Sequence, residues 1–475
     1  MALLLVVGCA PASPSPSPSV TASGTPLPTP TSAAATGRTP GAPPSASPAT
    51  AGPTTSPGPD DVGYVLINGT VLTMDQARPT AEALYVAGDT IVAVGTVDEV
   101  LAAAGPDARV FDLDGATVLP GFIDSHSHRI TQRSAWGFES VGDAVAEALA
   151  QGWTGIDELA VYPHDLGPLI EADAAGDLRL RLNVYLAVNS FSNDSFGDWY
   201  SAYEPGQQIS PNLRVAGLKI FIDFDSGRTL FWTQDALNEF VAQRHAEGWQ
   251  IAMKAIGQQS HELALNALEH ALAGESNADH RHRLEHSLAV NDAQLERMAR
   301  LQIVVGIQPS FPAVIWREED IRRLADEQGR NNMFRWPEYL AAGVIAAASP
   351  LNGGQQNEDR RDRTHMSPMG LLYRSVSQDA GDGETPEPWM LTRALSVDQL
   401  LPMMTIIGAF ADGNDDIRGS LTPGKLADLV VLSGDPLAVS TADLLGIDVL
   451  MTMVGGRIGW CAEAAGDLCA GLPPI

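Results

Sequence analysis

The sequence predicts an α/β protein, a TIM (β/α)8 barrel joined to a β-sandwich that is assembled from both ends of the chain. Apolar strand-like segments alternate with helical segments through the middle of the chain, which is typical of a parallel sheet with crossover helices. Shorter β-rich runs precede and follow this region. The length of 475 residues exceeds a typical single core, so a large barrel with an accessory domain is expected.

The chain begins with a short apolar run, MALLLVVGC. This run resembles the lipobox of bacterial lipoproteins, in which the cysteine becomes the lipidated first residue of the mature protein. It is too short to span a bilayer. Residues 1–9 are therefore predicted to be a lipoprotein-type signal segment with Cys9 as the lipidation site; a buried apolar strand is the alternative. The resemblance implies an exported protein, anchored to the outer face of the cell membrane.

Residues 10–60 are predicted to be a disordered linker. Pro, Ser, Thr, Ala and Gly dominate this stretch, and Arg38 is the only charged side chain before Asp60. Such a composition buries too little apolar surface to offset the entropy lost on ordering. Behind a lipid anchor at Cys9, the linker would hold the folded part away from the membrane.

The formal net charge of −29 argues against a nucleic-acid partner, because phosphate binding requires clustered Lys and Arg. An acidic surface that keeps an exported protein soluble is the simpler explanation. We therefore expect a small-molecule substrate as the partner, and contact with a membrane only through the lipid anchor. The oligomeric state is not predicted.

Residues 61–118 are predicted to form the N-terminal half of the sandwich. The runs YVLINGTVLTM, ALYVAGDTIVAVG and ARVFDLDGATVL are β-rich and are separated by Asn-Gly and Gly-Asp turn signals. Strand character returns within residues 412–475, in GKLADLVVLSGDP and DVLMTMVGGRIGW. These C-terminal strands are expected to join the N-terminal ones.

Residues 119–411 are predicted to form the barrel. Helical stretches such as VGDAVAEALAQG and SHELALNALEHAL separate the apolar strands. Eight repeats fit a TIM barrel better than an open doubly wound sheet. The predicted strands end near Asp124, Glu158, Asn189, Asp223, Gly257, His286, Pro309 and Pro350.

The first barrel strand, VLPGFIDSHSH, ends in two histidines. Side chains at positions i and i+2 of a strand point the same way, so His126 and His128 can direct imidazole nitrogens at one point. Such a pair suits a divalent metal. A pair of surface histidines at the end of a strand is the alternative.

Five stretches in order carry a family resemblance: PGFIDSHSH, LRVAGLKIFIDFDSGRT, MKAIGQ, RHRLEHS and GSLTPGKLADLVVLSGDPL. Together they resemble the amidohydrolase superfamily, and within it amidohydrolase family 3. The resemblance implies a metal centre at the C-terminal mouth of the barrel, where activated water hydrolyses a carbon–nitrogen bond.

The resemblance also assigns ligands. His126 and His128 match the ligand pair of the first strand, and His286 matches the ligand of the sixth. Lys219 matches a fourth-strand lysine that forms a carbamate with carbon dioxide in related enzymes. Zinc is the expected ion, with one ion favoured over two. A histidine satisfied in the core and a lysine that reaches the barrel rim are the alternatives for His286 and Lys219.

Two departures from the family pattern alter this site. Lys254 stands where the family has a fifth-strand histidine, and the eighth strand runs from Ser349 directly to Pro350 without the usual aspartate. A charged lysine would oppose a second metal ion. The missing aspartate removes both a ligand and the usual general base.

Three interpretations follow. The first is a hydrolase with a depleted metal centre, in which Glu158 replaces the missing proton shuttle, with Glu358, Asp359 and Asp362 as other candidates. In the second, Lys254 polarises a substrate carbonyl or pairs with a carbamylated Lys219, unless it is simply bound in a salt bridge. The third is an inactive exported lipoprotein that binds a small ligand. We expect a metal-dependent hydrolase that acts on non-peptide carbon–nitrogen bonds of the amide, formamide or ureido type.

Two residues after the fourth strand are candidate substrate contacts. Arg228 is expected to clamp an anionic or carbonyl group, and Trp232 to supply an apolar wall. A surface salt bridge and a packing tryptophan are the alternatives. Near the C-terminus, Cys461 and Cys469 flank EAAGDL. In an oxidising compartment they are expected to form a disulfide, with two free thiols as the alternative.

Overall fold

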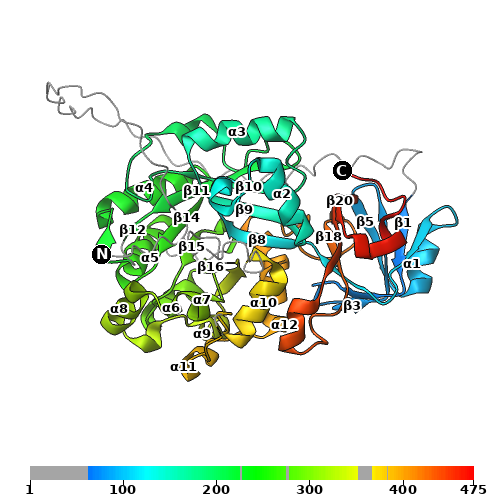
Figure 1. Cartoon of the computed structure of the whole chain (residues 1–475). Coiled ribbons are helices and arrows are strands. Elements are labelled where there is room, and N and C mark those ends of the chain that lie inside the picture. The colour runs from blue at the N-terminus through cyan, green and yellow to red at the C-terminus, as the bar shows by residue number, and fades with distance from the viewer. Residues whose placement is uncertain (1–62, 225–226, 274–277, 351–365, 382) are drawn as a thin grey trace.

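The computed structural model describes residues 63–224, 227–273, 278–350, 366–381 and 383–475 (Figure 1). The signal segment with Cys9 and the linker over residues 10–60 lie outside the described residues. So do three of the candidate carboxylates, Glu358, Asp359 and Asp362.

In the described part of the chain, the central sheet has eight strands, and every neighbouring pair is parallel. The first and last strands meet where Ser125 Oγ donates to the carbonyl oxygen of Ala348 over 3.2 Å. The TIM barrel prediction is confirmed. The strands, in order, are β8 (Phe122–Ser127), β9 (Trp153–Val161), β10 (Arg181–Ala187), β11 (Leu213–Phe221), β14 (Gln250–Ala255), β15 (Arg283–His286), β16 (Val304–Ile307) and β17 (Ile345–Ala348).

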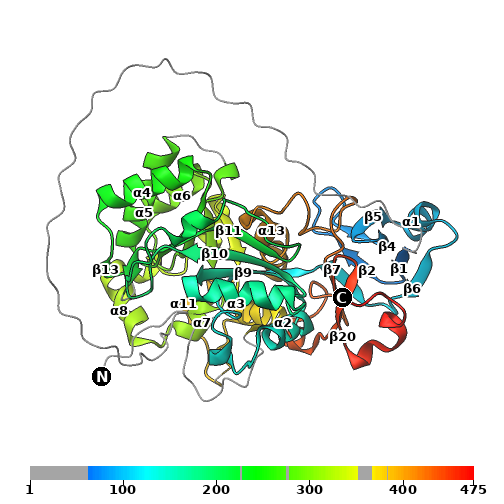
Figure 2. The same cartoon turned by 90° about the horizontal axis from the view of Figure 1, so that it is seen from above.

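Helices cover the outside of the barrel (Figures 1 and 2). The Ser140 side chain accepts a hydrogen bond from the backbone N–H of Asp143, and the Asp143 side chain accepts one from the backbone N–H of Ser140. This capping box fixes where α2 begins. The buried face of α2 consists of Val and Ala side chains with Leu149, at the spacing of a helical stripe. The barrel helices are α2 (Val141–Ala150), α3 (Pro163–Ala174), α4 (Gln234–Ala246), α5 (Gln258–Leu272), α6 (Asp292–Arg300), α7 (Phe311–Ile315), α8 (Glu319–Gln328), α9 (Trp336–Ala341), α10 (Pro368–Ser377), α11 (Pro388–Leu391), α12 (Val397–Met403) and α13 (Ile406–Ala411).

Two further sheets lie beside the barrel, where the blue and red parts of the chain meet in Figure 1. β7 pairs with β18 on one side and with β2 on the other, so strands from both ends of the chain share one sheet. One sheet contains β1 (Tyr64–Ile67), β4 (Ala83–Ala87), β5 (Thr90–Gly95) and β6 (Arg109–Asp112), with α1 (Val97–Ala104) beside it. The other contains β2 (Thr70–Leu72), β3 (Thr80–Ala81), β7 (Thr117–Pro120), β18 (Leu429–Leu432), β19 (Val449–Val454) and β20 (Arg457–Cys461).

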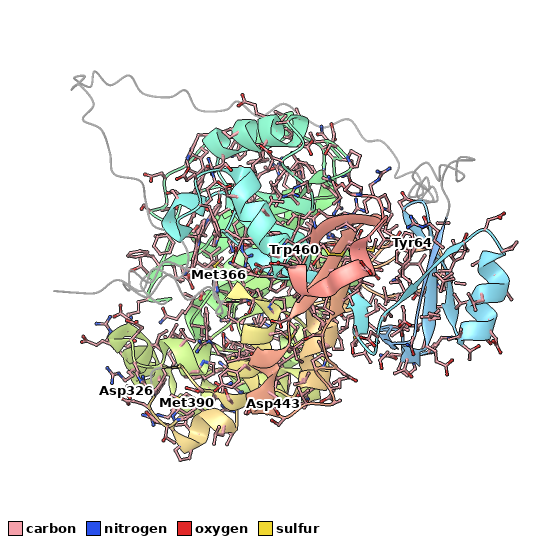
Figure 3. All side chains as sticks on the ribbon, turned by 45° about the vertical axis from the view of Figure 1, so that its right-hand side comes forward. Tyr64, Asp326, Met366, Met390, Asp443 and Trp460 are labelled. Carbon is pink, nitrogen blue, oxygen red and sulfur yellow. A yellow bond between two sulfur atoms is a disulfide. The ribbon has the colours of Figure 1, made fainter. Side chains whose placement is uncertain are left out.

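The two sheets enclose one apolar core. Leu66 and Val86 of the first sheet belong to the same buried cluster as Val118 and Met451 of the second. The Tyr64 hydroxyl crosses between the sheets and donates to the Gly456 carbonyl over 3.0 Å; Tyr64 is labelled in Figure 3. The composite sandwich is therefore present as predicted.

A disulfide joins Cys461 at the end of β20 to Cys469 in the short 3-10 helix Glu463–Cys469. It fastens the C-terminal tail to the sandwich. No helix in the described ranges is long and apolar enough to cross a membrane.

Candidate metal centre

His126 and His128 lie together at the C-terminal end of β8. Both side chains are buried, and their ring centroids are 5.3 Å apart. The alternation of side chains along a strand places both on the inner side of the barrel. Their burial excludes the alternative that they are two surface histidines at the end of a strand.

His286 reaches the same place from the end of β15. Arg283 and Glu285 point into the barrel, so alternation alone would direct His286 away from it. Positive φ angles at His286 (74°) and Ser287 (46°) turn the backbone at this point. The His286 ring centroid consequently lies 4.7 Å from that of His126.

Lys219 completes the group from β11, where it is buried. Burial is the largest cause that lowers the pKa of the three histidines, and the nearby Lys219 ammonium lowers each pKa further. For His126 the pKa falls to about 4. The structure thus gathers the four predicted ligands, and the histidines are held neutral, as metal ligands must be.

Hydrogen bonds select which ring nitrogens carry a lone pair. His126 Nδ1 donates to Glu285 Oε2 over 2.6 Å, and His286 Nδ1 donates to Gln308 Oε1 over 3.0 Å. Each ring therefore presents Nε2 as the nitrogen able to bind metal. His128 Nδ1 is buried and has no hydrogen-bond partner among the described residues.

The candidate donors are three imidazoles and the Lys219 amine. No three His, Cys, Asp or Glu side chains in the described part of the chain are arranged to hold a metal as they stand. The His126 ring nevertheless lies within 5.3 Å of the His128 ring and 4.7 Å of the His286 ring, measured between centroids, and the Lys219 charge acts on all three. The set is rich in nitrogen, which zinc accepts.

Glu285 is held in turn by its neighbours. Arg283 Nε donates to Glu285 Oε1 over 2.7 Å, and Arg283 Nη1 donates to Asp157 Oδ2 over 2.8 Å. All three side chains are fully buried. Gly306 on β16 leaves room for the carboxylate, because a Cβ there would lie 2.1 Å from Glu285 Oε2. These contacts fix the orientation of the His126 ring.

Lys254 is paired with Asp223. Its Nζ binds Asp223 Oδ1, while the other carboxylate oxygen, Oδ2, accepts from the backbone N–H of Ile256 over 2.8 Å. Both side chains are buried. Lys254 lies opposite Phe221 in the β11–β14 register, beside the mouth of the barrel. The salt bridge that the sequence left open is therefore present.

The chain matches the model of the amidohydrolase family over residues 137–459. It belongs to the amidohydrolase family. The expectation of an amidohydrolase-type enzyme is confirmed at that level.

Related proteins agree with this assignment. The chain is 24% identical to N-substituted formamide deformylase of Arthrobacter pascens, over 82% of this chain and 97% of the relative. It is 22% identical to imidazolonepropionase of Porphyromonas gingivalis, over 74% of this chain and 82% of the relative.

Solved structures share the fold. A metal-dependent hydrolase of Pyrococcus horikoshii OT3 aligns with a TM-score of 0.64 at 17% identity, over 80% of this chain and 99% of that chain. Atrazine chlorohydrolase of Arthrobacter aurescens TC1, complexed with zinc, aligns with a TM-score of 0.57 at 17% identity, over 83% of this chain and 94% of that chain.

In this amidohydrolase, Glu158 contacts the loop that follows His128. Its carboxylate accepts hydrogen bonds from the N–H groups of Ile130 (3.2 Å) and Thr131 (2.8 Å) and from the Thr131 hydroxyl (2.6 Å). Burial raises the pKa of Glu158 to about 7. These contacts position the loop beside the histidine pair, and the proton-shuttle role stays a prediction.

The two candidate substrate contacts are engaged within the protein. Arg228 Nε donates to Glu327 Oε2 on α8 over 3.0 Å. Trp232 Nε1 donates to the Phe221 carbonyl over 3.2 Å, and its ring packs against Phe240. These contacts match the structural alternatives that the sequence left open, and substrate binding by either residue stays a prediction.

Sequence reasoning missed Asp223, Glu285 and Gln308 as parts of this site. Glu285 stands directly before His286 in RLEHS, two positions from Arg283, so strand alternation was a usable signal. Asp223 was noted only as the end of a strand. No sequence signal identifies Gln308, which also donates from Nε2 to Ser349 Oγ over 2.9 Å at the end of the eighth strand.

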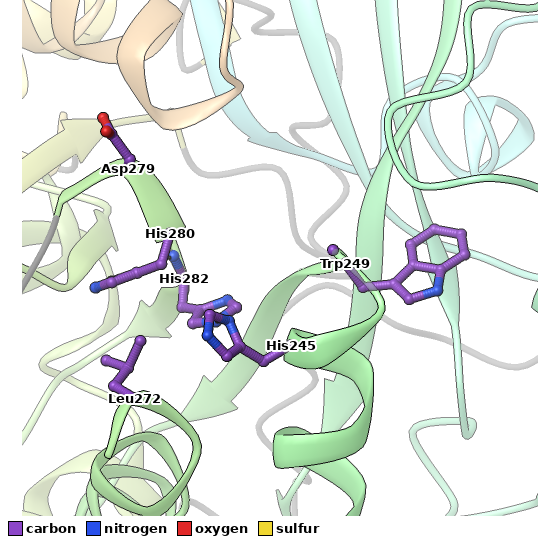
Figure 4. Close-up of a pocket in the computed structure, with 7 residues that line it drawn as sticks. His245, Trp249, Leu272, Asp279, His280 and His282 are labelled. Atoms are coloured by element: carbon purple, nitrogen blue, oxygen red, sulfur yellow. Dashed lines mark hydrogen bonds between the residues drawn. The ribbon is translucent and has the colours of Figure 1, made fainter. Parts of the chain in front are cut away.

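A second histidine group lies at the opposite end of the barrel, before β14 and β15 (Figure 4). His245, His280 and His282 line a pocket of about 310 Å³ together with Trp249. His282 Nδ1 accepts from the Ile251 N–H, so its Nε2 is the protonated nitrogen and donates to His245 Nδ1 over 3.0 Å. These hydrogen bonds occupy both nitrogens of His282, which therefore cannot also bind a metal.

Proposed function

We propose that this amidohydrolase is a metal-dependent hydrolase that cleaves non-peptide carbon–nitrogen bonds in small molecules of the amide, formamide or ureido type. One observation carries the proposal: three buried histidines lie side by side at the mouth of the barrel, with the buried Lys219 near enough for its charge to lower the pKa of each. The similarity to N-substituted formamide deformylase along nearly the whole length of that relative supports this reaction class.

We assign the metal to His126, His128 and His286, with Lys219 as the fourth ligand. A bound divalent ion would polarise the substrate carbonyl and lower the pKa of water. Addition of carbon dioxide to neutral Lys219, with loss of a proton, would give a carbamate whose oxygen is a better ligand than the amine. Glu285 and Gln308 would keep the histidine rings oriented.

One ion, with zinc as the expected metal, fits the site better than two. Lys254 stands where the family resemblance places a ligand histidine, and its ammonium would repel a second divalent cation there. Both oxygens of Asp223 are already engaged. Lys254 would therefore serve as the fixed positive charge beside the substrate carbonyl. Glu158 remains the candidate that moves the proton.

Activity should be measured on N-substituted formamides, simple amides and ureido compounds, before and after dialysis against a chelator. Hydrolysis that is lost with the chelator and restored by zinc supports the proposal. Ligand binding without turnover by the fully metallated protein would instead indicate an inactive binding protein.

The role of Lys254 can be tested by Lys254→His. This variant should take up a second ion per chain, measured by elemental analysis, because the repelling charge becomes a ligand. An unchanged metal content would remove Lys254 from the surroundings of the metal. A paired measurement on Lys254→Met separates loss of charge from gain of a ligand.

We also propose that the protein is exported and anchored by lipid at Cys9. The lipobox-like run supports this proposal, as does the Cys461–Cys469 disulfide, which is typical of oxidising compartments. Metabolic labelling with a fatty acid should mark the wild type and leave Cys9→Ser unlabelled. Labelling of both proteins, or of neither, would contradict the anchor.

A further inference from the structure

A pocket of about 100 Å³ lies at the N-terminal end of the barrel strands, opposite the candidate metal centre. Its walls come from the start of β10, the start of β11 and the segment that follows α13. We name it the basal arginine pocket, after the three arginines that line it, Arg181, Arg214 and Arg418. We propose that it binds a small oxyanion of the phosphate or sulfate type.

Among the described residues, the charged side chains that line this pocket are all guanidinium groups. Arg181 is neutralised by Asp428 through two hydrogen bonds of 2.9 and 3.1 Å. Arg418 pairs with Asp412. Among the described residues, Arg214 forms no ion pair with a carboxylate; its Nη1 donates to the backbone carbonyl of Asp412 over 2.6 Å. One guanidinium charge is therefore left without a counter-charge.

Arg418 supplies a second observation. Only 2% of this residue is exposed, and its Nε and Nη1 are buried without a hydrogen-bond partner among the described residues. A buried charged donor that lacks an acceptor is costly. Arg418 also lines the pocket, and an anion bound there would reach these two donors only after the Arg418 side chain rotates, because both atoms are closed off in this structure.

The neutral donors of the pocket are already used. Asn212 Nδ2 donates to the Leu178 carbonyl over 2.7 Å, and Asn414 Nδ2 donates to Asp412 Oδ1 over 2.7 Å. Gln208 Nε2 donates to the Ser210 carbonyl. The donors that remain belong to guanidinium groups, which match the geometry of oxyanions.

The volume of the pocket limits the size of the ligand that it can hold. Pockets that hold drug-sized molecules usually exceed about 300 Å³. The basal arginine pocket is about a third of that size, which admits an inorganic oxyanion and excludes a nucleotide. The charge, the spare donors and the size therefore point to the same ligand class.

The test uses the full chain with inorganic phosphate and, separately, sulfate, at an ionic strength held constant with chloride. Binding is measured by titration calorimetry and by the shift in Tm. We expect saturable binding that Arg214→Gln weakens at least about tenfold, because it removes the uncompensated charge. Arg214→Lys keeps the positive charge but lacks the forked guanidinium group, so it should bind phosphate with intermediate affinity. If Arg214→Gln does not fold, Arg214→Lys is the variant that is compared with the wild type.

Two controls make the result specific. Arg78→Gln, on an exposed arginine of the sandwich, should bind phosphate as the wild type does. His126→Asn should also retain phosphate binding, which separates this pocket from the metal centre and from the proposed activity. Equal binding by wild type and Arg214→Gln, no saturable binding, or loss of binding in His126→Asn would each overturn the proposal.

Discussion

Glu285 is the residue through which the barrel interior controls the candidate metal centre. Its two oxygens bind His126 and Arg283, and Arg283 in turn binds Asp157. The carboxylate cannot move without breaking one of these buried bonds. The orientation of His126 is therefore set inside the barrel, below the mouth.

Gly306→Ala tests this dependence. The new Cβ would collide with Glu285 Oε2, at 2.1 Å, and displace the carboxylate from His126. Loss of such a supporting partner typically lowers metal affinity about 10–100-fold. Affinity should be measured by competition with a chelating dye. Gly167→Ala, where a Cβ meets nothing within 4 Å, is the control; equal affinity in both variants would contradict the account.

Asp223→Asn tests the buried ion pair. Removing one partner leaves the Lys254 ammonium without a counter-charge in the interior, which typically costs about 3–5 kcal/mol. The free energy of unfolding in urea should fall by this amount. Asp292→Asn breaks the pair with Arg335, in which the Asp292 side chain is 85% exposed, and should cost less than about 1 kcal/mol. Equal losses would argue against a buried pair.

At the residue scale, sequence could predict the histidines and not their partners. His126 and His128 follow from strand alternation, and Lys219 and His286 from family resemblance. The Lys254–Asp223 pair depends on the β11–β14 register, in which Phe221 lies opposite Lys254. Register is a property of the folded sheet, so the sequence left the pair open.

At the scale of elements, the histidine group before β14 and β15 requires neutral rings. His282 Nδ1 accepts from the Ile251 N–H, and His280 Nδ1 accepts from the His282 N–H. Protonation of either Nδ1 would place its N–H against the backbone N–H that now donates to it, and the hydrogen bond would be lost. Burial, reinforced by the neighbouring histidines, lowers the pKa of His282 well below its usual value.

This group predicts acid sensitivity of the barrel base. Below about pH 6.5 the unfolded chain binds a proton at His282 that the folded chain does not bind. The contribution of His282 to the free energy of unfolding is therefore fully present above about pH 6.5 and is lost as the pH falls. The loss attributable to His282 should reach about 1.4 kcal/mol at pH 5.5. It is measured as the difference between wild type and His282→Asn in urea unfolding at pH 7.5 and 5.5.

His164→Asn is the control for this measurement, because 77% of that side chain is exposed. It should show the same change in stability with pH as the wild type. An identical pH dependence in His282→Asn would contradict the role of the group.

The Cys461–Cys469 disulfide makes a prediction for the end of β20. Closing a loop between residues 8 apart is worth about 2–3 kcal/mol at most in the chain-entropy account. Reduction should lower the free energy of unfolding by up to this amount. The double variant Cys461→Ser, Cys469→Ser should not respond to the reductant, whereas a wild type that also fails to respond would refute the contribution.

Element positions were accessible to sequence where periodicity was strong. The apolar spacing over VGDAVAEALAQG corresponds to α2, and that over SHELALNALEHAL to α5. The short hairpin of β12 (Asp223–Phe224) and β13 (Thr229–Leu230) was missed, because two-residue strands carry no alternation. The turn of the backbone at His286 could not be predicted from the sequence either, because a positive φ at histidine has no sequence signature.

At the scale of the whole molecule, the two ends of the chain are joined in one sheet. β7 leads through Gly121 directly into β8 and the histidine pair, while its other neighbours are β18 and β2. The sandwich therefore holds the start of the strand that carries His126 and His128. The sequence predicted this joining from β-rich runs at both ends, although the order of strands required the structure.

We predict that side chains from β8, β11 and β15 form a centre for one metal ion. Elemental analysis of the purified chain, loaded with zinc and freed of excess metal, tests it most directly. We predict about one ion per chain in the wild type and almost none in the double variant His126→Asn, His286→Asn. Two ions per wild-type chain, or equal metal content in the variant and the wild type, would contradict it.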